Sequence, residues 1–401
     1  MTHDTSLTPN WHHSRIGSTR VAFAVYVFVI LIGTTYPAHA NLPNRSSNTT
    51  SRSSIALGIF QPPTYDYGNE IKAINALANK NHALTLVYTD WSQPFSTFAF
   101  LQDQINKQIP SADRPILMIA WGPTNGRKLL GCDTDYSGAV LLTKIISGSC
   151  DSYIRQYANA MKARSERFLL KFAHEMNGLQ PWSPTNFNQS PQVYVDAWRH
   201  VKNIFAQVNT PNVEWVWGPI YKSNPDTPAN QPENYYPGNQ YVDWVAVSGF
   251  NYYDTWTPKR PWTTFKEIFG GILFRFGCMY PKPQLVHEFA GVEDTSGNYS
   301  KSQWIISAYT EMQDFPLLHG IIWYNDTDFN YPQIDYRITT STNAANQVVG
   351  LPIDSKSWTE AYKTAIAPSV FSSKLISLAN ATSSIATSER CSKQFLPLIN
   401  N

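Results

Sequence analysis

The sequence predicts a (β/α)8 barrel, and three observations point to it. Short apolar runs alternate with longer amphipathic segments from about residue 55 to residue 366. Some runs, such as residues 115–121 (PILMIAW), are apolar at almost every position, which is typical of parallel strands buried on both faces. Eight such strands can be placed along one chain, and this number favours a closed barrel over an open sheet.

Each expected strand is an apolar run, and most are followed by an amphipathic helix. We expect strands at residues 55–61, 84–91, 115–121, 168–173, 213–217, 244–250, 284–289 and 320–324. We expect helices at residues 69–80, 95–109, 152–164, 191–208, 263–274, 301–314 and 358–366. Two long loops, 124–150 and 219–241, interrupt the alternation and are the places where substrate specificity would be built.

The N-terminus is typical of a secretory signal. Arg15 and Arg20 precede an apolar run of 13 residues, 21–33, which is short for a membrane span, and an A-x-A cleavage site ends at Ala40. We therefore expect a secreted chain that starts near Asn41 and has no stable membrane insertion after cleavage. An uncleaved anchor is the alternative.

Four segments follow from these patterns. Residues 1–40 are the expected signal peptide, and the polar residues 41–54 the expected linker. Residues 55–370 form the expected catalytic barrel, and residues 371–401 a Ser/Thr-rich tail.

Export permits disulfides, and the chain has four cysteines. Cys132 and Cys150 flank one loop and are the preferred pair, which leaves Cys278 with Cys391, although four cysteines allow three pairings. No CxxC or HxxxH spacing occurs, so we expect no metal site, and no dinucleotide or phosphate motif suggests a cofactor.

The amino-acid composition limits the kinds of molecule that the chain could bind. Lys and Arg number 31 and Asp and Glu 29, so the chain lacks the basic excess of a nucleic-acid-binding protein. The 13 Trp, 22 Tyr and 20 Phe residues serve the core for the most part, but some could line a sugar groove. We expect a monomer that binds a polysaccharide.

In a barrel of this type, functional side chains lie at the C-terminal ends of the strands. The acidic residues at these ends are Asp90, Glu175, Asp254, Glu288 and Asp326. Glu175 ends the run FLLKFAHE and Glu288 ends QLVHE, so both follow an apolar strand directly, where a carboxylate must be solvated or paired. These strands, fourth and seventh in order, lie across the barrel from each other.

Two facing carboxyl groups suit the cleavage of a glycosidic bond. One group must be protonated to donate to the leaving oxygen, while the other must be ionised to attack the sugar or activate water. Different surroundings would separate their pKa values. The alternative is that each glutamate pairs with a nearby Arg or Lys and has a structural role.

The motif HEMNG after an apolar strand resembles the acid/base motif of glycoside hydrolase family 26, the β-mannanase family, and QLVHEFAG resembles its nucleophile strand. Further matching segments, in order, are AWRHVKNIF, NVEWVWGP, YYPGNQYVDWVAVSGFN, KSQW, IIWYND and DYRITTS, and the resemblance covers about residues 55–367. It implies a retaining mechanism, with the acid/base on the fourth strand and the nucleophile on the seventh.

The resemblance also assigns individual roles. It makes Glu175 the acid/base and Glu288 the nucleophile, with carboxyl groups at the shorter separation of retaining enzymes. His174 matches a sugar-contacting histidine, Trp182 a substrate-binding aromatic residue and Trp323 a stacking platform under the sugar. The match of Trp182 is displaced along the sequence, because the residues LQP stand between it and the HEMNG motif.

The sequence departs from the family at the sixth strand. A family tyrosine that hydrogen-bonds the nucleophile aligns with Phe250, so Tyr252 or Tyr253 would have to take its role. An acidic residue of the mannanases aligns with Ser248. Both changes bear on the specificity for mannan.

Three other residues near the strand ends draw attention. Trp121 could line the groove. His287 precedes the nucleophile and is expected to point to the opposite face of its strand, in a structural role. Lys171 lies inside an apolar strand, and the sequence identifies no partner for it.

We therefore expect a secreted, endo-acting retaining β-glycanase without a cofactor. β-1,4-Mannan is the first expected substrate, followed by mixed-linkage β-glucan or an exopolysaccharide. The alternative is a barrel that binds carbohydrate without turnover, although binding alone would not need a paired acid and nucleophile.

Overall fold

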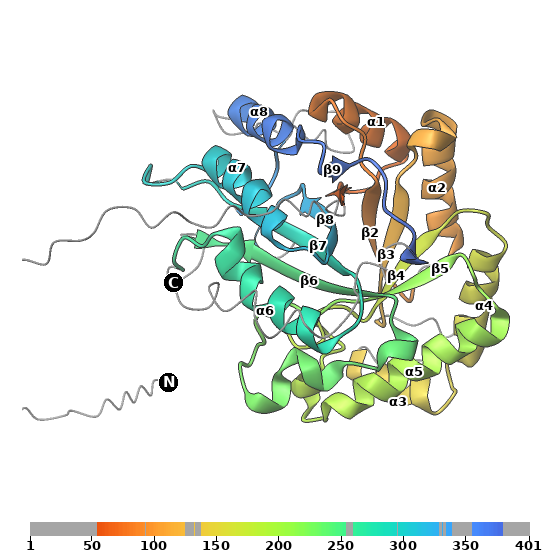
Figure 1. Cartoon of the computed structure of the whole chain (residues 1–401). Helices are drawn as coiled ribbons and strands as arrows, with labels where there is room; N and C mark the ends of the chain where they lie inside the picture. Colours follow the sequence, from red (N-terminus) through yellow and green to blue (C-terminus); the bar gives the residue numbers. More distant parts are fainter. Residues whose placement is uncertain are drawn as a thin grey trace, which may run out of the picture. The chain divides into compact units, whose positions relative to one another are not determined.

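The computed structural model describes residues 54–92, 94–124, 132, 138–253, 260–294, 296–328, 331, 334–338 and 355–379. The expected signal peptide and nearly all of the expected linker lie outside these residues. Eight parallel strands form a closed barrel with helices around it (Figure 1), which confirms the predicted fold. The barrel closes because β1 pairs with both β2 and β8.

The elements follow the predicted alternation, except that one helix, Gly138–Ile146, lies inside the expected loop 124–150. The barrel strands are β1 (Ile55–Phe60), β2 (Leu84–Asp90), β3 (Ile116–Gly122), β4 (Phe168–Phe172), β5 (Val213–Trp217), β6 (Trp244–Asn251), β7 (Gln284–Gly291) and β8 (Leu318–Tyr324). The helices are α1 (Tyr67–Ala78), α2 (Ser96–Gln108), α3 (Gly138–Ile146), α4 (Asp151–Lys162), α5 (Pro191–Val208), α6 (Phe265–Met279), α7 (Lys301–Glu311) and α8 (Ser355–Ile366). Short 3₁₀ turns connect β5 to β6 in place of a helix.

Each strand is buried on both faces because alternate side chains enter two separate cores. The barrel interior is filled by Ala56, Phe60, Leu84, Leu86, Met118, Ala120, Leu169, Val216, Trp244, Ala246, Leu285 and Ile322. The intervening residues, such as Leu57 and Ile119, pack outward against the helices. This alternation decides which residues reach the mouth of the barrel.

The barrel continues past its expected boundary at residue 370. A short strand, β9 (Phe371–Ser372), pairs with β1, and Leu375 is buried in the interior core. In Figure 1 this segment (dark blue) crosses from β9 toward β5. Residues 371–379 therefore close the N-terminal end of the barrel, because two apolar side chains in a polar stretch suffice to anchor it. The rest of the expected tail lies outside the described residues.

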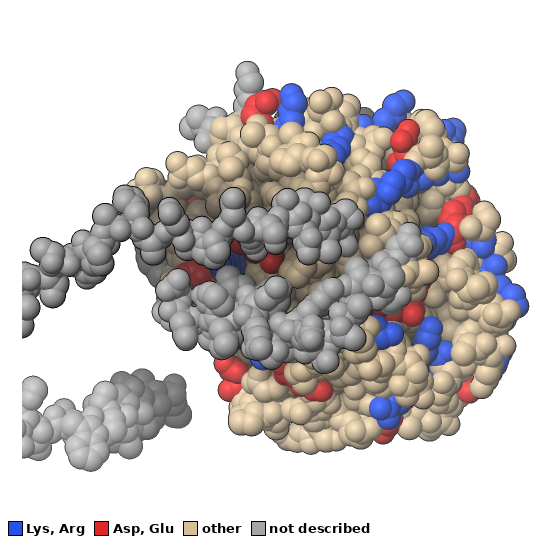
Figure 2. Space-filling view, viewed as in Figure 1, with Lys and Arg blue, Asp and Glu red and all other residues tan. Residues whose placement is uncertain are grey.

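On the face seen in Figure 2, acidic and basic side chains are scattered among uncharged residues. This agrees with the near balance of charge in the sequence. A helix both long and apolar enough to cross a membrane does not occur in the described part of the chain.

Candidate active site

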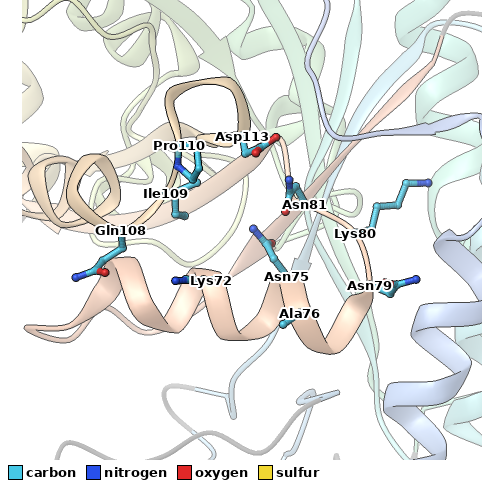
Figure 3. Close-up of a pocket in the computed structure, with 10 residues that line it drawn as sticks. All are labelled: Lys72, Asn75, Ala76, Asn79, Lys80, Asn81, Gln108, Ile109, Pro110 and Asp113. Carbon is cyan, nitrogen blue, oxygen red and sulfur yellow. The ribbon is translucent and has the colours of Figure 1, made fainter.

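Two regions of the barrel have polar groups that could form a functional site. One is a pocket at the N-terminal end of the barrel, between α1 and the connection from α2 to β3 (Figure 3). Its lining is mostly amides and lysines, with the single carboxylate of Asp113. The other is the C-terminal mouth, where both candidate glutamates lie, and only the mouth brings together groups able to exchange protons and attack a sugar.

Glu175 leaves the end of β4 in a turn of unusual backbone geometry. Ala173 has a φ of 44° and Glu175 a φ of 53°, a left-handed region that residues other than glycine rarely adopt. The Glu175 N–H donates to the carbonyl of Gly218 (2.8 Å), and the Gly178 N–H donates back to the Glu175 carbonyl (2.8 Å). Such backbone conformations gather at functional sites, where the surrounding structure enforces them.

Asn177 explains the amide in the HEMNG motif. Its Oδ1 accepts from the Ile220 N–H (3.0 Å), while its Nδ2 donates to the Ile220 carbonyl (3.0 Å) and to Ser223 Oγ (3.1 Å). The side chain is fully buried. It therefore ties the loop that carries Glu175 to the loop that follows β5.

Neutral donors hold the carboxyl group of Glu175. Ser248 on β6 donates its hydroxyl to Oε1, and Gln180 Nε2 donates to Oε2 (2.8 Å). Burial and then the nearby charge of Glu288 raise the pKa of Glu175, and the two hydrogen bonds offset this only in part. The surroundings therefore favour a protonated Glu175, as an acid requires.

Glu288 on β7 has the opposite surroundings. It is 5% exposed and forms an ion pair with Lys171, whose ammonium is fully buried. Burial alone would raise the pKa of Glu288, but the charge of Lys171 outweighs it and holds the pKa well below its ordinary value. Glu288 is therefore ionised, as a nucleophile requires, and Lys171 has the partner that the sequence did not identify.

His287 does not point away from the site as expected. Val286 pairs with Val247 and Glu288 with Ser248, so His287 is an extra residue in the β6–β7 ladder. His287 is in phase with the inward-facing Leu285, and the irregularity brings Glu288 to the same side. The His287 Nδ1 therefore lies 2.8 Å from Lys171 Nζ and 3.1 Å from Glu288 Oε1.

The ring of His287 is neutral. Burial, and then the charge of Lys171, lowers its pKa to about 4. A neutral ring can accept from the ammonium at Nδ1 and carry its proton on Nε2. Gly218 makes room for it, since a Cβ there would lie 2.7 Å from Nε2.

Three tyrosines surround the glutamates, and the sequence identified only one of them. Burial and then the charge of Glu288 raise the pKa of both Tyr88 and Tyr324, whereas burial and then Glu175 raise the pKa of Tyr252. All three phenols therefore lie within the electrostatic reach of Glu175, and Tyr88 and Tyr324 also within that of Glu288. The sequence does contain a signal for the other two, Tyr88 and Tyr324. In the alternation of inward and outward side chains, each is the last inward-facing aromatic residue of its strand.

His174 and Trp182 lie together beside the mouth. The Trp182 indole N–H donates to the His174 carbonyl (2.6 Å), and the two rings meet edge to face at 4.9 Å. The indole covers Gly122, where a Cβ would lie 2.6 Å from the ring. The His174 ring also approaches that of Tyr88 at 5.7 Å. Their predicted contacts with substrate remain predictions.

Trp323 and Trp121 do not line the mouth, contrary to expectation. Trp323 is fully buried, donates to the Tyr336 carbonyl (3.0 Å) and packs on Phe289 at 5.2 Å. Trp121 is also fully buried and stacks on Tyr157 at 4.4 Å. Both belong to the outward-facing set of their strands, so neither ring face can meet a sugar.

Phe250 faces the mouth from β6, with its ring 5.6 Å from that of Tyr252 and 5.7 Å from that of Tyr324. Of the two tyrosines expected to replace the family tyrosine, Tyr252 lies by Glu175. Tyr253 turns to Trp262 instead, at 5.3 Å. Asp254 lies outside the described residues.

Cys132 and Cys150 form the predicted disulfide. Cys278 is also disulfide-bonded, and its expected partner, Cys391, lies outside the described residues. Across the described ranges, no group of three or more His, Cys, Asp or Glu side chains is placed to hold a metal ion.

Comparison with known proteins supports the sequence resemblance. No protein-family model matches the chain. Endoglucanase H of Acetivibrio thermocellus is 27% identical over 282 residues, which cover 68% of this chain but only 28% of that protein. This chain thus spans well under a third of the length of the curated relative.

Solved structures share the fold. A family 26 β-mannanase from Bacteroides ovatus has a TM-score of 0.54 at 14% identity, covering 82% of this chain and 91% of that one. An endo-β-mannanase/endo-β-glucanase from Prevotella bryantii has a TM-score of 0.51 at 14% identity, covering 80% and 44%. Family 26 β-mannanases are thus structural neighbours of this chain, as the sequence resemblance predicts.

Proposed function

We propose that this chain is a secreted, endo-acting retaining β-glycanase with Glu175 as acid/base and Glu288 as nucleophile. The observation that carries the proposal is the opposite electrostatic environment of two carboxyl groups in one mouth. Glu288 is paired with a buried cation, while the contacts of Glu175 within the described structure come from neutral donors. A protonated and an ionised carboxyl group can thus coexist at one pH.

The proposed reaction has two steps. Glu288 attacks the anomeric carbon, the glycosidic C–O bond breaks, and Glu175 gives its proton to the leaving oxygen. Glu175 then takes a proton from water, the water oxygen attacks the anomeric carbon, and the ester bond to Glu288 breaks. No step uses a metal or cofactor.

Lys171 has a changing role along this path. It stabilises the ionised nucleophile before attack, but it faces a neutral ester once Glu288 carries the sugar. His287 then supplies an acceptor for the buried ammonium, since its Nδ1 already lies 2.8 Å from Lys171 Nζ. The pair can therefore favour return of the carboxylate, which is the second step.

For the substrate we place β-glucan before β-1,4-mannan, which reverses the order expected from the sequence. The curated relative, with the higher identity, is named an endoglucanase. The residues that resemble mannanases least, Ser248 and Phe250, face the mouth, and Ser248 contacts Glu175 directly. The mannanase neighbours keep mannan as the second candidate.

The decisive experiment follows the first product by nuclear magnetic resonance, with mixed-linkage β-glucan, β-1,4-mannan, β-1,3-xylan and a bacterial exopolysaccharide as substrates. A retaining enzyme releases the β anomer before mutarotation. An α first product would exclude the double displacement. Binding without turnover of any substrate would favour the alternative, a carbohydrate-binding barrel.

The same assay separates the glutamates. Glu288→Ala should abolish turnover of every substrate, because the covalent intermediate cannot form. Glu175→Ala should lose most activity on polysaccharide but retain part of it on an activated aryl glycoside, whose leaving group needs little protonation. Equal loss on both substrates for Glu175→Ala would rule it out as the acid.

A further inference from the structure

Three aromatic side chains form a cluster beside the mouth, where β6 and β7 end. The Trp262 and Tyr299 rings stack with centroids 4.7 Å apart and planes within 7°. Tyr253 meets both rings edge-on, at 5.3 and 5.4 Å. We call these three residues the aromatic ledge.

The ledge is both exposed and held in place. Tyr299 is 45% exposed, whereas most large aromatic side chains of the barrel are buried. Its loop is fixed by the carboxylate of Asp294, which accepts from the backbone N–H groups of Ser296 (2.7 Å), Asn298 (2.8 Å) and Tyr299 (2.9 Å). A ring ordered before binding loses little freedom when a ligand stacks on it.

The ledge is continuous with the catalytic centre along β6. Ser248, Phe250 and Tyr252 occupy every second position at the end of the strand. Ser248 donates to Glu175, and the rings of Phe250 and Tyr252 lie 5.6 Å apart. The next residue, Tyr253, belongs to the ledge. A sugar chain that leaves the mouth past Tyr252 thus meets the ledge next.

The side of the mouth can also be assigned. Ser248 on β6 donates its hydroxyl to Glu175, whereas Glu288 is contacted by Lys171 on β4 and His287 on β7. The acid contacts the oxygen of the leaving group, and the nucleophile contacts the sugar that stays bound. The β6 side is therefore the leaving-group side.

We propose that the aromatic ledge binds the sugar units on the leaving-group side of the cleavage point, by stacking the apolar faces of β-linked pyranose rings on Tyr299 and Trp262. This inference rests on the proposed function and adds a binding site to it. Stacking on flat rings suits a neutral polysaccharide, which offers apolar faces and hydroxyls but no charge.

The test compares a substrate that reaches the ledge with one that does not. Tyr299→Ala and Trp262→Ala are assayed on the polysaccharide that the parent cleaves and on the 2,4-dinitrophenyl β-disaccharide of the same sugar. We expect kcat/KM on the polysaccharide to fall by about tenfold and that on the aryl disaccharide to stay within about twofold, since its leaving group stops short of the ledge. Ile306→Ala, a 43% exposed residue on the outer side of α7, is the matched control and should change neither.

A second readout uses glycosyl transfer. With the aryl disaccharide as donor and a trisaccharide as acceptor, the acceptor hydroxyl attacks the anomeric carbon of the Glu288 ester. The ester bond breaks, and Glu175 takes the hydroxyl proton. Transfer should decline relative to hydrolysis in Tyr299→Ala and not in Ile306→Ala.

The outcomes are distinct. Equal losses on both substrates, or no loss on either, would overturn the ledge while leaving the proposed function intact. A parent chain that cleaves neither substrate would remove the proposed function and the ledge with it. If each variant unfolds thermally with the same midpoint temperature as the parent, its loss of activity is not caused by a loss of folding.

Discussion

A cation lies at each end of strand β4, half-buried Arg167 just before it and buried Lys171 near its C-terminal end, and the two are paired in different ways. At the N-terminal end, Arg167 forms two bonds with the carboxylate of Glu214 (2.6 and 2.7 Å), and the Trp244 indole adds a third (2.7 Å). At the mouth, Lys171 is shared between Glu288 and the neutral ring of His287. The first arrangement fixes a geometry, whereas the second keeps a carboxylate ionised and free to react.

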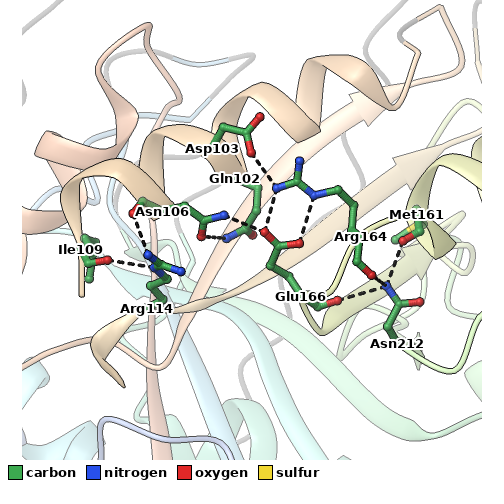
Figure 4. A network of polar contacts seen from close by, with 9 residues as sticks. All are labelled: Gln102, Asp103, Asn106, Ile109, Arg114, Met161, Arg164, Glu166 and Asn212. Carbon is green, nitrogen blue, oxygen red and sulfur yellow. Dashed lines mark hydrogen bonds and ion pairs between the residues drawn. The ribbon is translucent and has the colours of Figure 1, made fainter. Parts of the chain in front are cut away.

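The surroundings extend this contrast. Near the N-terminal end, Arg164 binds Asp103 and Glu166, and Asn106 and Asn212 extend this network (Figure 4). Burial would raise the pKa of Glu166, but Arg164 and Asn106 outweigh it and lower that pKa to about 2. This end is built for stability.

The mouth differs in its backbone, which is strained beside Glu175. His174 Nδ1 is buried without a hydrogen-bond partner in the described structure. At the N-terminal end of the barrel, Asn79 and Asn209 adopt left-handed backbone at helix ends, a conformation that asparagine tolerates. At the mouth, Ala173 and Glu175 adopt it, although these residue types rarely do. One end of the barrel thus serves stability, and the other end serves catalysis.

Lys171→Met tests the contrast most strongly. Glu288 would lose its counter-charge, so its pKa would rise and the nucleophile would be protonated at neutral pH. We expect kcat/KM to fall about a thousandfold, equivalent to about 4 kcal/mol. The acidic limb of the pH profile should move to higher pH, because ionised Glu288 is the active form. Lys171→Arg should restore part of the activity.

Arg167→Met is the matched change at the other end of β4. We expect kcat/KM to stay within about twofold, and the free energy of unfolding to fall by about 1–2 kcal/mol, since the pair is partly exposed and solvent screens it. A large change in the pH profile of this variant would break the separation of the two ends.

The disulfide tests whether the loops around the mouth need a covalent tether. Cys132 and Cys150 are separated by 18 residues, so the double variant Cys132→Ser/Cys150→Ser should lose about 3 kcal/mol of unfolding free energy. Urea unfolding measures the loss, and non-reducing peptide mapping verifies the bond in the parent. An unchanged midpoint would mean that non-covalent packing alone holds this region.

Leu375→Ala tests the non-covalent closure of the N-terminal end. The side chain is 8% exposed in the interior core, so its truncation should cost about 2 kcal/mol of unfolding free energy without affecting kcat. Lys374→Ala, an exposed neighbour, is the control and should unfold with the parent. Loss of activity without loss of stability would contradict a purely structural role.

Ser248→Ala should have the smallest effect. Its hydroxyl stabilises the ionised form of Glu175, so its removal raises the pKa of the acid further. Activity is lost as the acid deprotonates, and the basic limb of the kcat/KM profile should therefore move to higher pH, with less than about a tenfold change at the optimum. Gln180→Ala should shift the same limb by less, and a shift to lower pH would contradict the assignment.

Much of the fold was predictable because its signals are local. The runs of apolar residues placed all eight barrel strands, and the position of Glu175 and Glu288 directly after two of them marked the mouth. The orientation of Trp323 was predicted wrongly, because a resemblance carries a residue type while the alternation of the strand decides its face. Trp121 was considered for the groove because it ends its strand, and the same alternation turns it outward.

The sequence by itself determined the barrel, the two glutamates and the first disulfide, because strand alternation and short loops are encoded by neighbouring residues. Only the tertiary structure decided the pairing of Lys171 with Glu288, which are 117 residues apart, and the bond from Ser248 to Glu175, 73 residues apart. It also placed His287 and Glu288 on the same side of β7 through one extra residue in that strand. The physical reason is that barrel closure sets the register between distant strands, and a shift of one residue reverses the face of every side chain beyond it.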